Sequence, residues 1–238
     1  MAIKRITTLF CLLLLLAQTQ AESLHIAVTA SFRPVLDELA IEFEKETGIA
    51  LTVSSASTGT LYQQSLHGAP FDVFLSADKQ RPRALQEKLK LSEESVFIYA
   101  KGELVFVSTD PVLKKLEDIL QSKQRVIIAN AKVAPFGVAA EQVLVSINYQ
   151  GEKVLANNVM QAQQYLNLRL APTGIVSASV ALNLPSTPIP QSLYELVEQA
   201  GVVLNDTPVS QTFVKYLTSP KVLELYQKYG YSMADSTH

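Results

Sequence analysis

The sequence has one cysteine and three histidines in 238 residues. Cys11 therefore has no partner for a disulfide, and no cysteine or histidine cluster has the spacing of metal ligands. The histidines are His25, His67 and His238. None of them lies at the end of a predicted strand, and no G-x-S-x-G motif is present. We therefore expect no catalytic residues, no metal site and no cofactor.

Long apolar runs are also scarce. Residues 9–17 form one, which follows Lys4 and Arg5 and precedes Ala21, and this is the pattern of a cleaved secretory signal. We predict that residues 1–21 are the signal peptide. Cys11 lies inside the signal and not at its cleavage point, so no lipid attachment is expected. No later segment approaches the roughly 20 apolar residues of a membrane helix, which predicts a periplasmic protein without a membrane anchor.

Positive charge is not in excess. The chain has 20 Lys and Arg against 22 Asp and Glu, a formal net charge of -2. Loss of Lys4 and Arg5 with the signal lowers this from -2 to -4. An acidic chain is a poor match for nucleic acid, so we expect no nucleic-acid partner.

Short apolar runs alternate with segments of helical periodicity, which indicates an α/β fold. Residues 24–28, 49–53 and 72–76 read as strands, and a helix separates each from the next. Gly48 is placed to end the first helix. Strands are also expected at 96–100, 104–108, 125–129 and 173–177. This order predicts open, mostly parallel sheets with helices on both faces.

The apolar runs also allow two lobes. We predict that residues 22–102 and 205–238 form lobe 1 and that residues 103–204 form lobe 2. Strands near 103–108 and 201–204 would carry the chain between them as a hinge.

Small polar residues follow the predicted strands. In open α/β sheets ligands bind at the carboxyl ends of strands, where helices begin with unpaired amides. Residues at these junctions are Thr29–Ser31, Ser54–Gly59, Ala134–Gly137, Asn157–Val159 and Ser177–Ser179. Each hydroxyl or amide taken alone is explained by helix capping, which contributes about 1 kcal/mol.

Together, the junctions form a set of donors with no acidic or basic residue among them. If they converge, they form a site for an anion. Hydrogen phosphate carries a proton that needs an acceptor, whereas sulfate, molybdate and tungstate offer only lone pairs. A site made only of donors therefore favours the second group of ions.

Five segments have the order and spacing of one known family: "VTASFRPVLDELAIEFEKETGI", "SSASTGTLYQQSLHGAPFDVFLSAD", "APFGVAAEQVL", "NNVMQAQQYLNLRLAPTGIVSAS" and "VKYLTSPKVLELYQKYGY". In these the chain resembles the periplasmic molybdate-binding proteins of ABC importers. The resemblance implies two lobes of the periplasmic-binding-protein fold that close over one oxyanion, and a monomer that delivers the ion to a membrane permease.

The resemblance also implies the ligand set. It places the oxyanion against the Ser31 and Thr58 hydroxyls and the Phe136 and Val159 main-chain amides. Ser177 stands where the family often has a tyrosine hydroxyl, and either its own shorter side chain serves or that contact is missing. The role of Arg33 is left open, and Asp72 and Asp78 are expected to be local turn and cap groups.

Other functions are kept as alternatives. Binding of sulfate or of a small organic acid is one, although an organic acid would need a basic clamp and aromatic walls. A periplasmic hydrolase is a weaker alternative, because it would need a base that the predicted strand ends lack.

Overall fold

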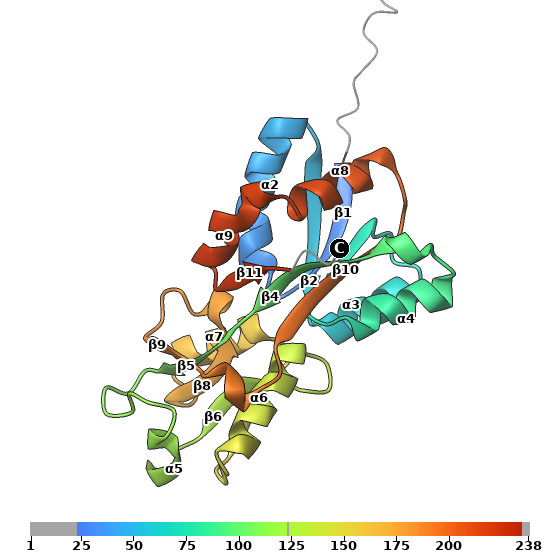
Figure 1. Cartoon of the computed structure of the whole chain (residues 1–238). Helices are drawn as coiled ribbons and strands as arrows, with labels where there is room; N and C mark the ends of the chain where they lie inside the picture. Colours follow the sequence, from blue (N-terminus) through green and yellow to red (C-terminus); the bar gives the residue numbers. More distant parts are fainter. Residues whose placement is uncertain (1–22, 123, 235–238) are drawn as a thin grey trace, which may run out of the picture.

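The computed structural model describes residues 23–122 and 124–234. The predicted signal peptide, Cys11 and His238 lie outside these ranges. The described chain forms two β-sheets flanked by helices (Figure 1). We refer to the parts around the first and second sheets as lobe 1 and lobe 2.

The first sheet has the strand order β11-β4-β10-β3-β1-β2. Its strands are β1 (Ser23–Thr29), β2 (Ala50–Ala56), β3 (Val73–Ser76), β4 (Val96–Gly102), β10 (Val197–Val203) and β11 (Tyr231–Met233). The second sheet has the order β7-β6-β8-β5-β9. Its strands are β5 (Leu104–Ser108), β6 (Val126–Ala129), β7 (Lys153–Ala156), β8 (Thr173–Ser177) and β9 (Ser186–Pro188).

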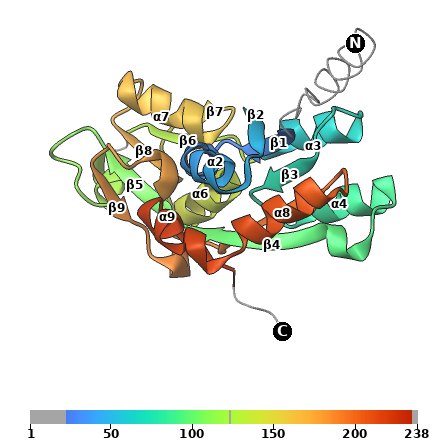
Figure 2. The same ribbon diagram turned by 90° about the horizontal axis from the view of Figure 1, so that it is seen from above.

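The helices lie between the strands as the periodicity predicts, and Figure 2 shows α3 and α4 side by side, on the far side of the molecule from α7. The α-helices are α2 (Arg33–Thr47), α3 (Thr58–Leu66), α4 (Gln80–Leu89), α5 (Asp118–Ser122), α6 (Pro135–Ser146), α7 (Val159–Asn167), α8 (Pro208–Leu217) and α9 (Leu223–Lys228). The 3-10 turns are η1 (Glu93–Ser95), η2 (Ala178–Val180), η3 (Gln191–Leu193) and η4 (Pro220–Val222). No helix in the described ranges is long and apolar enough to cross a membrane.

The first sheet is buried on both faces, which explains its apolar strands. Ile26 and Val28 of β1 join one hydrophobic core, whereas Ala27 faces another with Leu61 and Phe74. Gly48 ends α2 as predicted, in the left-handed conformation with φ of 75°, and its N–H donates to the Glu44 carbonyl.

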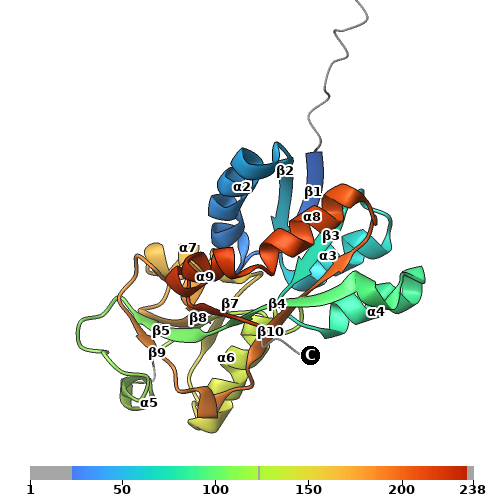
Figure 3. The same cartoon turned by 45° about the horizontal axis from the view of Figure 1, so that its top comes forward.

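Strand pairing is mixed in both sheets, and the prediction of mostly parallel sheets is wrong in this detail. β1 pairs in parallel with β2 and β3, and β6 pairs in parallel with β7 and β8. β10 is antiparallel to β3 and β4, and β5 is antiparallel to β8 and β9. The reason is that β4 and β5 carry the chain out to lobe 2 while β10 returns alongside β4 in the opposite direction (Figure 3).

The connections between the lobes fall at Glu103, between β4 and β5, and in the segment between β9 and β10. Residues 201–203, which we expected in the return connection, instead pair with β3 and β4 inside the first sheet. The return therefore lies earlier in the chain than the prediction placed it.

Candidate functional site

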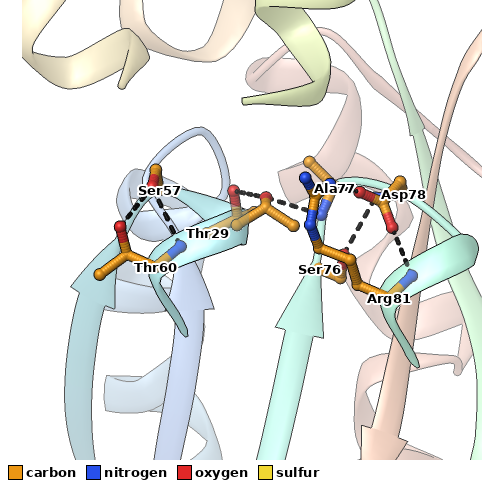
Figure 4. A network of polar contacts seen from close by, with 8 residues as sticks. Thr29, Ser57, Thr60, Ser76, Ala77, Asp78 and Arg81 are labelled. Carbon is orange, nitrogen blue, oxygen red and sulfur yellow. Dashed lines mark hydrogen bonds and ion pairs between the residues drawn. The ribbon is translucent and has the colours of Figure 1, made fainter. Parts of the chain in front are cut away.

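The hydroxyl cluster after β2 divides into two roles. Ser57 is the N-cap of α3: its Oγ accepts a hydrogen bond from the Thr60 N–H at 3.3 Å and lies 2.7 Å from the Thr60 hydroxyl (Figure 4). Thr58 is fully buried and turns toward the neighbouring strands instead. Its Oγ1 lies 2.9 Å from Oγ1 of Thr29, at the end of β1, and accepts a longer bond of 3.4 Å from the Ala77 N–H after β3. The carboxyl ends of three adjacent strands therefore meet at Thr58.

Ser31 lies in the turn after β1 with 1% of its surface exposed. Its Oγ makes no hydrogen bond of good geometry with the described residues, and the Tyr231 hydroxyl is near enough only for a weaker interaction. A buried polar atom left unpaired costs about 1 to 3 kcal/mol, so such atoms mark places where a ligand or water completes the bonding. Of the predicted site residues, Ser31 therefore has the clearest mark of a binding role.

Hydroxyls join Ser31 to lobe 2: Ser177 and Ser179 belong to lobe 2, and Tyr231 of lobe 1 bonds to the same group. The Ser179 Oγ donates to the Ser31 carbonyl at 2.6 Å, lies 3.0 Å from the Ser177 Oγ, and accepts from the Tyr231 hydroxyl at 3.3 Å. We call these four residues the serine bridge. It brings Ser31 and Ser177 close together, although 146 positions separate them in the chain.

The protons of this bridge can be assigned. A hydroxyl has one proton and two lone pairs. The Ser31 carbonyl can only accept, so the proton of Ser179 lies on that bond. Ser177 must therefore donate its own proton to Ser179. In this arrangement the Ser177 hydroxyl holds Ser179 in place and does not direct a proton at a ligand.

The two predicted amide donors both lie at helix starts. Phe136 is the second residue of α6 after Pro135, and Val159 is the first residue of α7. N–H groups in the first turn have no acceptor inside their own helix. Asn158 caps α7 through its side chain, which accepts from the Gln161 N–H at 2.9 Å, so this cap leaves the Val159 amide unused.

The start of α3 in lobe 1 meets the loop before α6 in lobe 2. The Gly59 N–H donates to the Val133 carbonyl at 2.9 Å, and a Cβ at Gly59 would lie only 3.1 Å from the Val133 Cα. Together with the Ser179–Ser31 hydrogen bond, this contact shows that the two lobes touch at two places. It brings the beginning of α6 close to Thr58.

Sequence reasoning missed three residues: Tyr231 in the serine bridge, and Tyr99 and Gln199 near it. Their apolar strands made them look like plain core. The Tyr99 hydroxyl lies 3.0 Å from the Gln199 Oε1 and 3.1 Å from the Ser76 carbonyl oxygen, which share its single proton as acceptors. Burial raises the pKa of Tyr231 to about 12, so its hydroxyl keeps its proton at neutral pH.

Comparison with known proteins identifies the family. The model of the bacterial extracellular solute-binding protein family matches residues 24–232. The chain belongs to this family. Among curated relatives, the molybdate-binding protein ModA of Azotobacter vinelandii is 34% identical over 92% of this chain and 94% of the relative. ModA of Rhodobacter capsulatus is 32% identical over 86% of each chain.

Solved structures of solute-binding proteins share the fold. The Azotobacter vinelandii periplasmic molybdate-binding protein superimposes with a TM-score of 0.82 at 30% identity, covering 89% of this chain and 100% of that chain. The sulfate-binding protein SubI of Mycobacterium tuberculosis has a TM-score of 0.76 at 12% identity, covering 90% and 88%. At that identity the second likeness shows the fold alone. The α/β fold of two lobes is therefore confirmed.

Charged residues near the junctions of this solute-binding protein are paired with other residues. Asp78 accepts from the Arg81 N–H at 2.9 Å and pairs with its guanidinium, and Asp72 accepts from the His25 N–H at 2.8 Å. Asp78 is thus the local cap that we predicted, whereas the prediction for Asp72 is wrong, because its carboxylate bonds the distant residues His25 and Asn205. Arg33 pairs with Asp37 at 2.6 Å on the same helix. In these contacts, no carboxylate directs an unpaired oxygen toward Thr58 or Ser31.

The histidines of the described chain are also engaged locally. His25 Nε2 lies 2.9 Å from the Ser54 Oγ, and His67 Nδ1 lies 2.7 Å from the Gln63 carbonyl. Among the described residues, no group of three or more His, Cys, Asp or Glu could hold a metal ion.

Proposed function

We propose that this solute-binding protein captures molybdate, and also tungstate, in the periplasm and delivers the ion to the permease of an ABC transporter. The single observation that carries the proposal is the Ser31 Oγ, which is buried in the turn after β1 and makes no hydrogen bond of good geometry with the described residues. Molybdate is proposed as the ion because the chain is similar, over most of its length, to two molybdate-binding ModA proteins. The protein acts by binding and release, without catalysis.

The proposed ligand set follows from the junctions. The Ser31 and Thr58 hydroxyls approach from lobe 1, and the Phe136 and Val159 amides approach from the starts of α6 and α7 in lobe 2. Hydrogen bonds to a charged group contribute about 1.5 to 3 kcal/mol each. Association costs at least about 4 kcal/mol, so four or five such bonds are consistent with micromolar binding or tighter.

Ser177 is assigned a supporting part in this proposal. We predicted it as a direct contact in place of a tyrosine, but its proton holds Ser179 in the serine bridge. It acts on the ligand through the Ser31 turn.

Closure of the lobes is the proposed mechanism of capture. Each lobe supplies part of the donor set, so an ion that bonds to both favours the closed arrangement. The contacts Ser179–Ser31 and Gly59–Val133 belong to that arrangement. The permease would recognise the closed molecule, which we propose is a monomer with its signal peptide removed.

The proposal is tested by isothermal titration of the protein with molybdate, tungstate, sulfate and hydrogen phosphate. We expect tight binding of the first two ions and weak or no binding of hydrogen phosphate. A ligand at 100 times its dissociation constant also raises the free energy of unfolding by about 2.7 kcal/mol, which thermal unfolding detects. Absence of heat and of thermal stabilisation with molybdate would refute the proposal.

Binding of sulfate is the second candidate, because the fold is shared with a sulfate-binding protein and sulfate also needs donors only. The same titration separates the two. Preference for sulfate over molybdate would assign the site to the smaller ion.

A further inference from the structure

Thr29 is the last residue of β1, and its hydroxyl is buried against Thr58. The two Oγ1 atoms are 2.9 Å apart, and either could be the donor. Figure 4 shows Thr29 at the end of its strand, close to Ser57 and Ala77. Thr29 was part of a junction that we singled out in the sequence, but neither the resemblance nor the proposed ligand set uses it.

The hydrogen-bonding capacity of Thr58 decides what Thr29 does. The Thr58 Oγ1 has two lone pairs and one proton. The Ala77 N–H can only donate, so it occupies one lone pair. If Thr29 donates as well, both lone pairs are filled, and the Thr58 proton must point away from Thr29 and Ala77.

We propose that Thr29 is a positioning residue that directs the Thr58 proton at the bound anion and prevents Thr58 from acting as an acceptor. This inference rests on the proposed function, because it assumes that an oxyanion is the partner of Thr58. A chain in which Thr29 donates to Thr58 and Thr58 donates to the anion polarises both bonds in the same direction, which strengthens them.

Selectivity follows from the same geometry. Hydrogen phosphate must place its own proton on an acceptor, and a Thr58 with both lone pairs occupied offers none. The carboxylate near this junction, Asp78, is held by Arg81. Thr29 thus helps to exclude protonated anions, although it does not need to touch the ligand.

Replacement of Thr29 by Val tests this inference, since valine keeps the shape and burial of threonine but lacks the hydroxyl. The Thr58 oxygen then regains a free lone pair. We expect the dissociation constant for molybdate to rise about tenfold. We also expect the preference for molybdate over hydrogen phosphate to fall, because the phosphate proton now finds an acceptor. Thr29→Ser, which restores a hydroxyl, should recover both values.

Thr173→Val is a matched control. Thr173 is a buried threonine at the start of β8, and its hydroxyl donates to the Arg125 carbonyl at 3.1 Å. This variant loses an internal hydrogen bond, but we expect molybdate affinity and selectivity to stay at their wild-type values. If Thr29→Val does not fold, Thr29→Ala, which adds a small cavity instead, takes its place in the same measurements.

Two results would overturn the inference. One is a Thr29→Val protein with wild-type affinity and wild-type selectivity. The other is an equal loss for all anions that Thr29→Ser does not recover, which would show a packing role only. Failure of the wild-type protein to bind molybdate is a different outcome, because it removes the proposed function itself.

Discussion

The Ser179 hydroxyl donates a 2.6 Å hydrogen bond to the main-chain carbonyl of Ser31 across 148 positions of sequence. Ser179 belongs to η2, directly after a strand of lobe 2, and Ser31 belongs to the first turn of lobe 1. The bond therefore closes the molecule at the same turn that carries the proposed ligand hydroxyl. It links the position of that hydroxyl to the approach of the lobes.

Replacement of Ser179 by Ala is expected to weaken molybdate binding about fivefold, since one net hydrogen bond of about 1 kcal/mol is lost only when the lobes meet. Titration calorimetry measures the loss. Ser146→Ala is the control, because its hydroxyl donates to the Leu193 carbonyl at 3.1 Å, away from Ser31. Equal affinities for the two variants would contradict a role in closure.

Replacement of both Ser31 and Thr58 by Ala should abolish the thermal stabilisation that molybdate produces, because two charge-assisted hydrogen bonds disappear from one face of the ion. Ser57→Ala serves as the control from the same cluster. Loss of this N-cap should lower the free energy of unfolding by about 1 kcal/mol, while the response to molybdate is kept. A double variant that still responds would show that the site has been misplaced.

Gly59→Ala is expected to separate affinity from stability. The new methyl group would lie 3.1 Å from the Val133 Cα and 3.2 Å from the Val133 carbonyl oxygen, so it crowds the contact between lobes. Within α3, alanine favours the helix by up to about 1 kcal/mol. We expect weaker binding by calorimetry with unchanged or higher stability in urea. Gln63→Ala, on the exposed face of the same helix, should change neither, and full affinity in Gly59→Ala would argue against closure at this contact.

Stability should fall in alkaline solution because of buried tyrosines. Burial raises the pKa of Tyr231 from 10.0 to about 12, and burial together with a hydrogen bond to Glu38 raises the pKa of Tyr229 to about 12. The folded state therefore keeps protons that the unfolded state releases. The stabilisation is complete below pH 10 and is lost as pH rises from about 10 to about 12.

Urea unfolding between pH 8 and pH 11.5 measures this loss. Tyr231→Phe removes one of the buried tyrosines with a raised pKa, so its free energy of unfolding should decline less steeply over the same range. A wild-type protein whose stability does not change above pH 10 would contradict the assignment.

Much of the fold could be predicted from local patterns. The apolar strands and the amphipathic helices follow their periodicities, and Gly48 ends α2 where expected. β7, β9 and β11 were not predicted, because strands of three or four residues with exposed positions carry no periodic signal. Their pairing partners, not their own residues, make them strands.

For the candidate site, the sequence could place residues along the chain but not their neighbours in space. The sequence placed Ser31, Thr58 and Ser177 at strand ends, and all three are buried there. It could not show that the proton of Ser177 is used by Ser179, or that the Tyr99 hydroxyl lies 3.0 Å from the Gln199 side chain in the core. These relationships join residues that are far apart or that look like ordinary core.

The sequence by itself determined the chemistry that this protein can offer: junctions rich in hydroxyls and amides, without a charged side chain, on alternating strands and helices. Tertiary structure decided which of those hydroxyls can give a proton to an anion. The physical reason is that a hydroxyl has a single proton, whose direction depends on every neighbour within hydrogen-bond distance. For Thr58 those neighbours come from the end of β1 and the turn after β3, and only folding brings them together.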